Sequence, residues 1–228
     1  MIYPLEGRKI LFLDPSSEHM GFAIMTCSGD RAIIEKAGML YASSSWDLGR
    51  KLHYMYSAIK YLVLNFQINT IVTEMFEMPK FRQMGISVIP TINNNLKMLS
   101  YEITSETGGS IEVVEWPISS WRKNLGISWV PAKKANGELI KTEKGNYKQD
   151  WKIPAKNKVE EFLKIKIPDQ LLDNSSLKLR KTPYDLSDCL AISIAYALKH
   201  NYPIIKSSPE VFENQKIMTI LYTMRKKV

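Results

Sequence analysis

Residues 9–37 read KILFLDPSSEHMGFAIMTCSGDRAIIEKA, and three apolar runs in this stretch alternate with turn-forming residues. Each run is rich in aliphatic or aromatic residues and has the length of a short strand. The proline, glycine, serine and aspartate residues between the runs favour tight turns. The stretch therefore predicts an antiparallel meander of three strands, at residues 9–14, 20–26 and 32–37.

Short β-branched runs and helical patterns alternate further along the chain, which is typical of an α/β fold with a partly parallel sheet. Apolar residues at helical spacing predict a first helix at residues 45–65, with Ser45 as its cap. Thr182, as a cap, and Pro183 open another strong helical pattern that continues to about His200. The other expected elements are strands at 70–74 and 111–115, helices at 90–107, 154–165 and 209–224, and a long basic loop at 128–150. This order predicts a five-stranded mixed sheet flanked by helices.

The net charge of +8 is concentrated in one part of the chain. Residues 121–182 contain 15 Lys and Arg against 7 Asp and Glu, whereas the rest of the chain carries equal numbers of both signs. Concentrated positive charge favours a polyanionic partner, and nucleic acid is the commonest one. A solvated, lysine-rich insertion is the alternative interpretation.

Cysteine content and hydropathy indicate the cellular setting. Cys27 and Cys189 are the only cysteines, and reduced, buried thiols are a simpler interpretation than a disulfide. The amino terminus lacks the pattern of a signal peptide, and no apolar run approaches the roughly 20 residues that cross a bilayer. We therefore expect a cytoplasmic protein with no membrane partner.

Four acids stand at positions that suit a shared site. Asp14 and Glu74 each end a short apolar run, so both side chains emerge at one edge if the two strands are neighbours in a sheet. Asp185 and Asp188 are three residues apart at the start of a helix, which places them on one helical face. Taken singly, each acid is typical of a turn residue or a helix cap. Their order along the chain favours a common site.

Carboxylates that share a small volume raise one another's pKa, and a hard divalent cation relieves this repulsion. Mg²⁺ prefers a few carboxylates together with water and phosphate oxygens. Two such ions about 3.5–4 Å apart stabilise the attacking and leaving oxygens of phosphodiester hydrolysis. We therefore expect the four acids to be both metal ligands and catalytic residues, and the basic segment to bind the phosphates.

Three short motifs around these acids resemble the RuvC family of Holliday junction resolvases. The run from Ile10 to Ala23 is similar to the family's first motif, in which a strand ends in Asp-Pro-Gly-Ser and a glycine follows. Ile71-Val-Thr-Glu74 resembles the second motif, a strand ending in the catalytic glutamate. Tyr184-Asp-Leu-Ser-Asp-Cys-Leu-Ala-Ile192 is similar to the last, Asp-x-x-Asp-Ala-Leu-Ala on a helix. The resemblance is scattered over most of residues 8–200.

The resemblance implies an RNase H-like fold, a homodimer, and two Mg²⁺ ions per active site, for which Mn²⁺ substitutes. It implies a crossover junction endodeoxyribonuclease of DNA recombination and repair, which makes paired nicks across a four-way junction and has no small-molecule substrate. Asp14 would bridge both metals, Glu74 would ligate one, and Asp185 and Asp188 would complete the set. Residues 1–206 would form the nuclease domain, with an insertion near 128–150 and a helical extension at 207–228.

Basic residues near the motifs are the candidates for contacts with DNA. Arg122, followed by Lys123, resembles a family position that is usually lysine and lies near the scissile phosphate. Lys156 resembles a second basic position, for which Lys158 is the rival. The segment MFEMPKFRQM, residues 75–84, is a candidate substrate-facing loop or dimer contact. Its residues with the chemistry to bind DNA are Phe76, Lys80 and Arg82.

The sequence also departs from the family pattern. Ser16 stands where the family has glycine, and Glu77 stands where the family has an aromatic residue near the branch point. Residues 75–184 form a longer stretch than is typical of the family, and the tail after about residue 207 is extra. Such variants resemble phage-encoded relatives that accept several branched structures, which suggests the cytoplasm of a bacterium or a phage-infected cell.

Other features have two interpretations. The tryptophans in or beside the basic segment either stack on exposed bases or pack within the fold; they are Trp116, Trp121, Trp129 and Trp151. His19 is a lone histidine near Asp14, which favours a surface or turn role over a zinc site. The competing functions are a catalytically silent DNA-binding protein and an actin-like ATPase. The second would need another glycine-rich phosphate loop and a longer chain.

Overall fold

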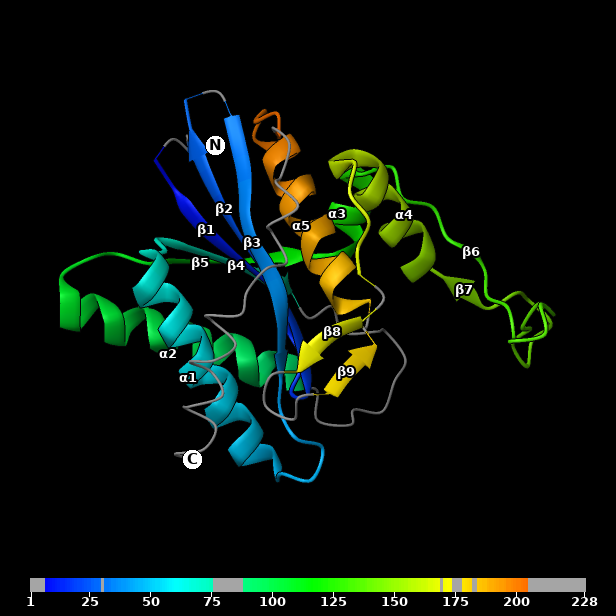
Figure 1. Ribbon diagram of the computed structural model, residues 1–228, viewed down its shortest axis with the longest axis horizontal. Coiled ribbons are helices and arrows are strands. Elements are labelled where there is room, and N and C mark those ends of the chain that lie inside the picture. The colour runs from blue at the N-terminus through cyan, green and yellow to red at the C-terminus, as the bar shows by residue number, and fades with distance from the viewer. Residues whose placement is uncertain are drawn as a thin grey trace.

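The computed structural model describes residues 7–29, 31–75, 88–168, 170–173, 178–181 and 184–204. At its centre lies a five-stranded sheet (Figure 1). The strands are β1 (Lys9–Asp14), β2 (His19–Ser28), β3 (Arg31–Tyr41), β4 (Thr70–Met75) and β5 (Glu112–Pro117). The predicted order of three strands, helix, strand, helix, strand is confirmed, and β2 and β3 are longer than expected.

The sheet is mixed, with the strand order β3-β2-β1-β4-β5. The meander β1-β2-β3 is antiparallel, and β4 and β5 continue the sheet parallel to β1. Parallel strands need crossover connections, and helices supply them here. β1 and β4 are consequently neighbours that end at the same edge of the sheet.

Helices cover both faces of the sheet (Figure 1). The crossover helices α1 (Leu48–Phe66) and α2 (Val88–Thr107) pack on one face, where Leu11, Leu13 and Ile71 are buried among their apolar residues. On the other face lie α3 (Ile118–Asn124), α4 (Lys152–Leu163) and α5 (Asp185–Lys199). α5 lies directly over β1 and β2, and nearly all of its residues from Leu186 to Ala197 are buried. This burial holds the first turn of α5 in a definite place.

Several boundaries differ from the sequence-based expectations. Asp47, not Ser45, caps α1, because its carboxylate accepts a hydrogen bond from the amide of Arg50 at 2.9 Å. α4 begins at Lys152, two residues earlier than predicted. α5 begins at Asp185, after Tyr184, whereas the predicted cap Thr182, Pro183 and the predicted helix 209–224 lie outside the described residues. The short helix α3 was not predicted.

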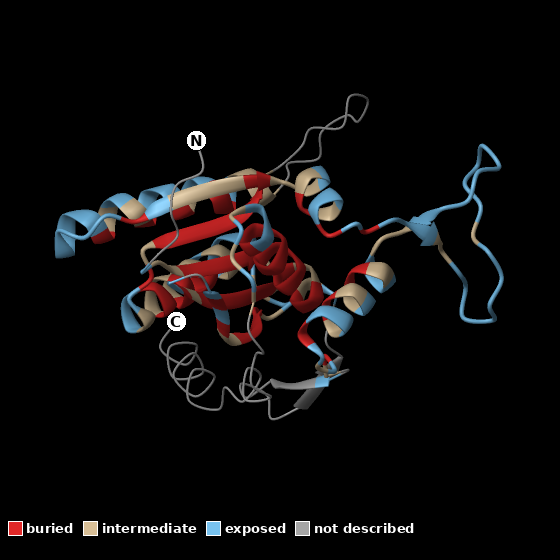
Figure 2. Cartoon of the chain, turned by 90° about the horizontal axis from the view of Figure 1, so that it is seen from above, coloured by how far each residue is buried: buried red, intermediate tan, exposed pale blue. Residues whose placement is uncertain are grey.

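The predicted long loop at 128–150 contains a short strand pair, β6 (Val130–Pro131) with β7 (Gln149–Asp150). It extends away from the body of the protein, and nearly all of it is exposed (Figure 2). A further pair, β8 (Gln170–Asp173) with β9 (Lys178–Lys181), precedes α5. Cys27 and Cys189 are buried free thiols. None of the described helices is long and apolar enough to cross a membrane.

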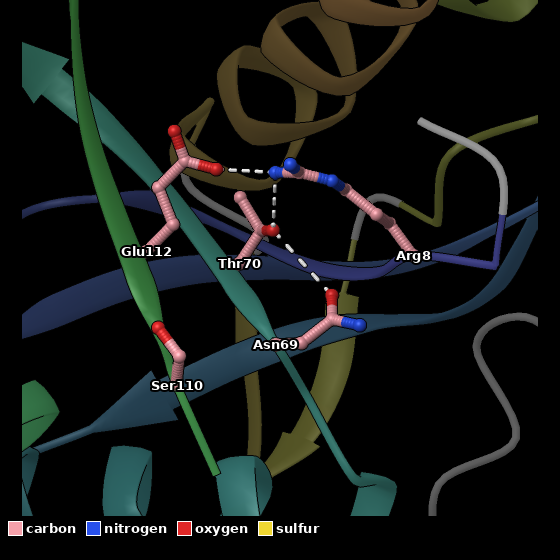
Figure 3. Close-up of a pocket in the computed structure, with 5 residues that line it drawn as sticks. All are labelled: Arg8, Asn69, Thr70, Ser110 and Glu112. Atoms are coloured by element: carbon pink, nitrogen blue, oxygen red, sulfur yellow. Dashed lines mark hydrogen bonds and ion pairs between the residues drawn. The ribbon is translucent and has the colours of Figure 1, made fainter. Parts of the chain in front are cut away.

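The amino ends of the parallel strands are joined by a polar clamp (Figure 3). The guanidinium of Arg8 donates to the hydroxyl of Thr70 at 3.2 Å and forms an ion pair with Glu112. Asn69 accepts a hydrogen bond from the amide of Lys9 at 3.1 Å, which ties the start of β1 to the start of β4. A cavity of about 550 Å³ is lined by this clamp. It lies at the end of the sheet opposite to Glu74, so it is separate from the acids discussed next.

Candidate active site

Asp14 and Glu74 end neighbouring parallel strands and project to the same face of the sheet. The register pairs Leu13 with Thr73, so the next residues of the two strands are these acids. Side chains alternate between the faces of a strand. Phe12 of β1 and Val72 of β4, two residues before each acid, are both buried on the face that α5 covers. The two carboxylates therefore point towards α5.

The first turn of α5 carries Asp185 and Asp188 close to these strand ends. Gly21 of β2, which is opposite Asp14 in the antiparallel register, makes this approach possible. A Cβ at position 21 would collide with the backbone carbonyl of Asp185, so only glycine fits there. The thiol of Cys189 donates a hydrogen bond to the carbonyl of Phe12 at 3.2 Å and further fixes the helix on β1.

The four carboxylates interact electrostatically. Burial raises the pKa of Asp14 well above its ordinary value, and the charges of Glu74, Asp188 and Asp185 raise it further. Burial, followed by the charge of Glu74, raises the pKa of Asp188 to about 7. Burial also raises the pKa of Asp185, although the nearby Lys152 opposes this. The structure thus brings all four predicted acids together at one edge of the sheet.

A ready-made ligand cluster is not present among the described residues. No three carboxylate, imidazole or thiol groups in the described part of the chain form a group that could directly hold a metal ion. The acids therefore share an electrostatic field without converging on one point. Carboxylates that are grouped in this way stay ionised only if positive charge lies close to them.

Glu74 is held in place by two buried residues, Trp121 and Asn93, neither of which was expected from the sequence to contact it. The indole of Trp121, which is fully buried, donates a hydrogen bond to the carboxylate of Glu74 at 2.9 Å. The amide of Asn93 on α2 donates to the carbonyl of Glu74 at 3.0 Å and to the carboxylate of Glu115 at 3.1 Å. Asn93 thereby joins the carboxyl ends of β4 and β5. Only the position of Trp121 beside Arg122 in the sequence could have indicated this role.

Two cations lie beside the acids. Lys152, at the first position of α4, lowers the pKa of Asp14, Asp185 and Asp188 against the effects of burial and like charge. Arg122, at the end of α3, has the same effect on Asp188. These cations reduce the repulsion among the acids only in part, because the pKa of each of the three remains raised.

The guanidinium of Arg122 lies over two indole rings. Its Cζ lies 5.1 Å from the ring centre of Trp121 and 4.9 Å from that of Trp151, within the range of cation–π attraction. Its Nε is buried and makes no hydrogen bond within the described residues. Among the four tryptophans with two interpretations, Trp116 and Trp121 are buried and therefore pack within the fold, whereas Trp129 is 40% exposed.

The other predicted basic residues are exposed, pair with acids of their own helix, or lie outside the described residues. Lys123 is exposed on α3. Lys156 lies 3.9 Å from Glu160, and Lys158 lies 3.2 Å from Glu161, so each pairs with an acid of its own helix. Lys152, one helical turn before Lys156, was not predicted. Phe76, Lys80 and Arg82 lie outside the described residues, as does most of the segment 75–84.

The turn after Asp14 accommodates serine without strain. Ser16 is not among the described residues with a positive φ, and its hydroxyl lies 3.4 Å from the amides of Glu18 and His19, which donate to it. The glycine of the family motif is therefore not required in this turn. His19 does not lie in the turn: it is the first residue of β2, it packs edge-on against Tyr41 with 5.6 Å between the ring centres, and it lies near enough to Asp185 to lower the pKa of that carboxyl.

Trp121→Phe is expected to reduce any activity that depends on Glu74 by about 10- to 100-fold, the usual cost of losing a hydrogen bond behind a metal-binding side chain. Phenylalanine keeps the ring in the core but cannot donate to the carboxylate. The activity and Tm of this variant should be compared with those of Trp116→Phe, which alters a buried indole of β5. An equal loss of activity in both variants would contradict a specific role of the Trp121 hydrogen bond.

The sheet order, its mixed strand directions and the helices on both faces define an RNase H-like α/β fold. No protein-family model and no curated protein sequence matches the chain. Solved structures do. RuvC from Thermus thermophilus is similar with a TM-score of 0.50 and 14% identity, over 84% of this chain and 95% of that chain. The structure of T. thermophilus RuvC in complex with a Holliday junction substrate is similar with a TM-score of 0.50 and 13% identity, over 84% of this chain and 95% of that chain.

A third similar structure is the yeast mitochondrial Holliday junction resolvase Ydc2, with a TM-score of 0.48 and 14% identity, over 100% of this chain and 86% of that chain. At these identities the likeness concerns the fold. The protein thus has the five-stranded mixed sheet, flanked by helices, of RNase H-like resolvase structures.

Proposed function

We propose that this protein is a magnesium-dependent endonuclease that cleaves four-way DNA junctions and other branched DNA. The observation that carries the proposal is the gathering of four acids from three separate segments at one edge of an RNase H-like sheet, where burial raises the pKa of Asp14, Asp185 and Asp188 and the charges of neighbouring acids raise those of Asp14 and Asp188 further. Such a group destabilises the fold unless it binds something positive. The similarity to the fold of RuvC supports the choice of reaction.

The donor set fits a hard divalent cation. All four groups are carboxylates, which Mg²⁺ prefers to nitrogen or sulfur ligands, and the raised pKa of Asp188 indicates an environment short of positive charge. Asp14, Glu74, Asp185 and Asp188 are the residues that would hold two ions. When bound, the ions would supply charge stabilisation to the phosphate and lower the pKa of water.

The remaining residues of the proposed site orient the carboxylates and supply positive charge beside them. Trp121 holds one carboxylate oxygen of Glu74 and so limits the directions in which that side chain can turn. Lys152 and Arg122 flank the acids and would attract the phosphodiester and oppose its developing charge. The stacking of Arg122 on two indole rings reduces the conformational freedom that it would lose on binding.

Lys152→Gln is expected to lower kcat/KM for junction cleavage by about 10- to 100-fold, because an oriented cation beside the reacting phosphate is lost. Lys156→Gln is the matched control. It removes the same charge from the same helix, one turn after Lys152, at a lysine that lies 3.9 Å from Glu160. Single-turnover cleavage at several salt concentrations measures the difference. Equal losses in both variants would mean that α4 contributes only general positive charge.

The decisive experiment for the proposal compares labelled four-way junctions, three-way junctions, flaps and linear duplexes in Mg²⁺, in Mn²⁺ and in Ca²⁺. The proposal predicts cleavage of branched DNA in Mg²⁺ and Mn²⁺, with binding but little cleavage in Ca²⁺. Paired nicks that ligase reseals would identify a junction resolvase, whereas scattered cuts would identify a less selective debranching nuclease. Retention of junctions without cleavage in any metal would instead favour a silent binding protein.

We also propose that the active form is a homodimer in the cytoplasm. A four-way junction presents two equivalent strands to be cut, and a dimer with two-fold symmetry supplies two equivalent sites. Sedimentation of the protein alone and with a junction tests this, and a stable monomer on the junction would contradict it.

A further inference from the structure

Residues 128–150, which we name the arm, leave the body of the protein between two elements of the candidate site. The arm follows α3, which carries Arg122, and precedes α4, which begins with Lys152. Its base is therefore beside the acids, while the rest projects away from the sheet (Figures 1 and 2). Any long ligand that lies across Arg122 and Lys152 passes close to the base of the arm.

Backbone hydrogen bonds give the arm a definite shape. Its base is the antiparallel pair β6–β7, and its two turns are closed by Gly137 and Gly145 at φ of +87° and +78°. A ring of three hydrogen bonds joins its three segments: Ala132 N to Lys148 O at 2.7 Å, Lys148 N to Ile140 O at 2.8 Å, and Ile140 N to Ala132 O at 2.8 Å. These bonds join backbone groups only, so we expect substitutions of surface side chains to leave the scaffold of the arm in place.

The surface of the arm is basic and partly aromatic. All five of its lysines are exposed, at positions 133, 134, 141, 144 and 148. Lys134 forms an ion pair with Glu138 at 2.9 Å, and within the described part of the chain no carboxylate lies within ion-pair distance of the other four. Tyr147 is 44% and Trp129 is 40% exposed. No residue of the arm is among the buried residues that pack on the two faces of the sheet.

We propose that the arm binds the sugar–phosphate backbone of a DNA duplex that leaves the active site. This inference rests on the proposed function for the identity of the ligand. Lysines that are exposed on an ordered scaffold, next to flat aromatic faces, suit contacts with phosphates and sugars that do not depend on sequence. The arm thus extends the bound surface from the scissile phosphate to a neighbouring arm of the junction.

The test removes the charge of the arm without touching the candidate site. The arm variant carries Lys133→Gln, Lys141→Gln, Lys144→Gln and Lys148→Gln. The control variant has the same change in net charge on the body of the protein: Lys36→Gln, Lys97→Gln, Lys164→Gln and Lys199→Gln. A third variant replaces residues 132–148 by Gly-Gly, which joins Pro131 to Gln149, two residues already paired in β6–β7.

Binding to a fluorescent four-way junction and to a linear duplex is measured by anisotropy in Ca²⁺. We expect the arm variant to lose at least about tenfold in affinity, and its plot of log K against log salt between about 50 and 200 mM to flatten by two to four, since each phosphate contact contributes about 0.9. The third variant should show the same loss of affinity and the same change of slope as the arm variant. The control variant should stay close to the wild type.

Equal effects of the arm and control variants would overturn the inference, and so would a loss of self-association in the arm variant with DNA binding unchanged. The outcomes also separate this inference from the proposed function. A wild type that cuts junctions but binds them equally well without the arm retains the function and refutes the inference. A wild type that binds junctions through the arm but never cleaves them retains the inference and refutes the proposed function.

Discussion

Asp14→Asn is expected to reduce the single-turnover rate of junction cleavage by about 1,000-fold or more, because even the loss of a residue behind a metal ligand commonly costs 10- to 100-fold. Asp14 has the most central position among the acids, since the charges of Glu74, Asp188 and Asp185 all act on it. Asparagine keeps the shape of the side chain and removes its charge. Binding of the junction in Ca²⁺ should remain within a few-fold of the wild type.

Glu161→Gln is the matched control for this substitution. It removes one carboxylate from the exposed side of α4, where Glu161 pairs only with a lysine of its own helix among the described residues. Its cleavage rate should equal that of the wild type. If Asp14→Asn retains more than a tenth of the wild-type rate at an unchanged Tm, the acids are not the catalytic centre.

Asp188→Asn is expected to stabilise the metal-free protein at pH 8 by about 2–4 kcal/mol, which corresponds to roughly 4–16 °C in Tm for a chain of this size. Burial and the charge of Glu74 raise the pKa of Asp188 to about 7 from an ordinary value of 3.8. A raised pKa means that the folded state disfavours the charged carboxylate, so the charge lowers the free energy of unfolding at pH 8. Thermal unfolding in EDTA measures the gain, and a lower Tm of this variant would contradict the origin of the shift.

The same shift sets the pH dependence of the wild type in EDTA. As the pH falls from 8 towards 5, Asp188 takes up a proton in the folded state but not in the unfolded state, so the free energy of unfolding should rise. The raised pKa of Asp14 acts in the same direction. Asp188→Asn should flatten this rise, and Mg²⁺ at pH 8 should increase the Tm of the wild type more than that of the variant. A wild type whose Tm is constant or falls between pH 8 and pH 6 would contradict the prediction.

The order and type of the central strands could be predicted because each carries its own local signal. The run KILFLD and the β-branched run before Glu74 are short and apolar, and turn residues bound the meander. Helical spacing likewise identified α1 and α5. The cap of α1 was wrongly assigned to Ser45 because Asp47, two residues later, is an equally good capping residue and only the backbone path decides between them.

The candidate site was predictable in its acids and less so in its neighbours. Acids at strand ends and at a helix start are visible as patterns, whereas Trp121 and Asn93 reach Glu74 from distant elements. Lys156 fits the family motif by sequence, yet Lys152 is the lysine of α4 that acts on the acids. One helical turn separates them, and the docking of α4 determines which turn faces the site.

The sequence by itself determined which residues can form strands, which acids can share an edge, and where positive charge gathers, because these depend on neighbours along the chain. Only the tertiary structure decided how closely α5 approaches β2 at Gly21, which indole supports Glu74, and that residues 128–150 form an ordered projection. The first two features arise from contacts between segments far apart in sequence, and the third from backbone hydrogen bonds among three segments of the arm. Their geometry depends on how buried surfaces pack, and no local pattern records it.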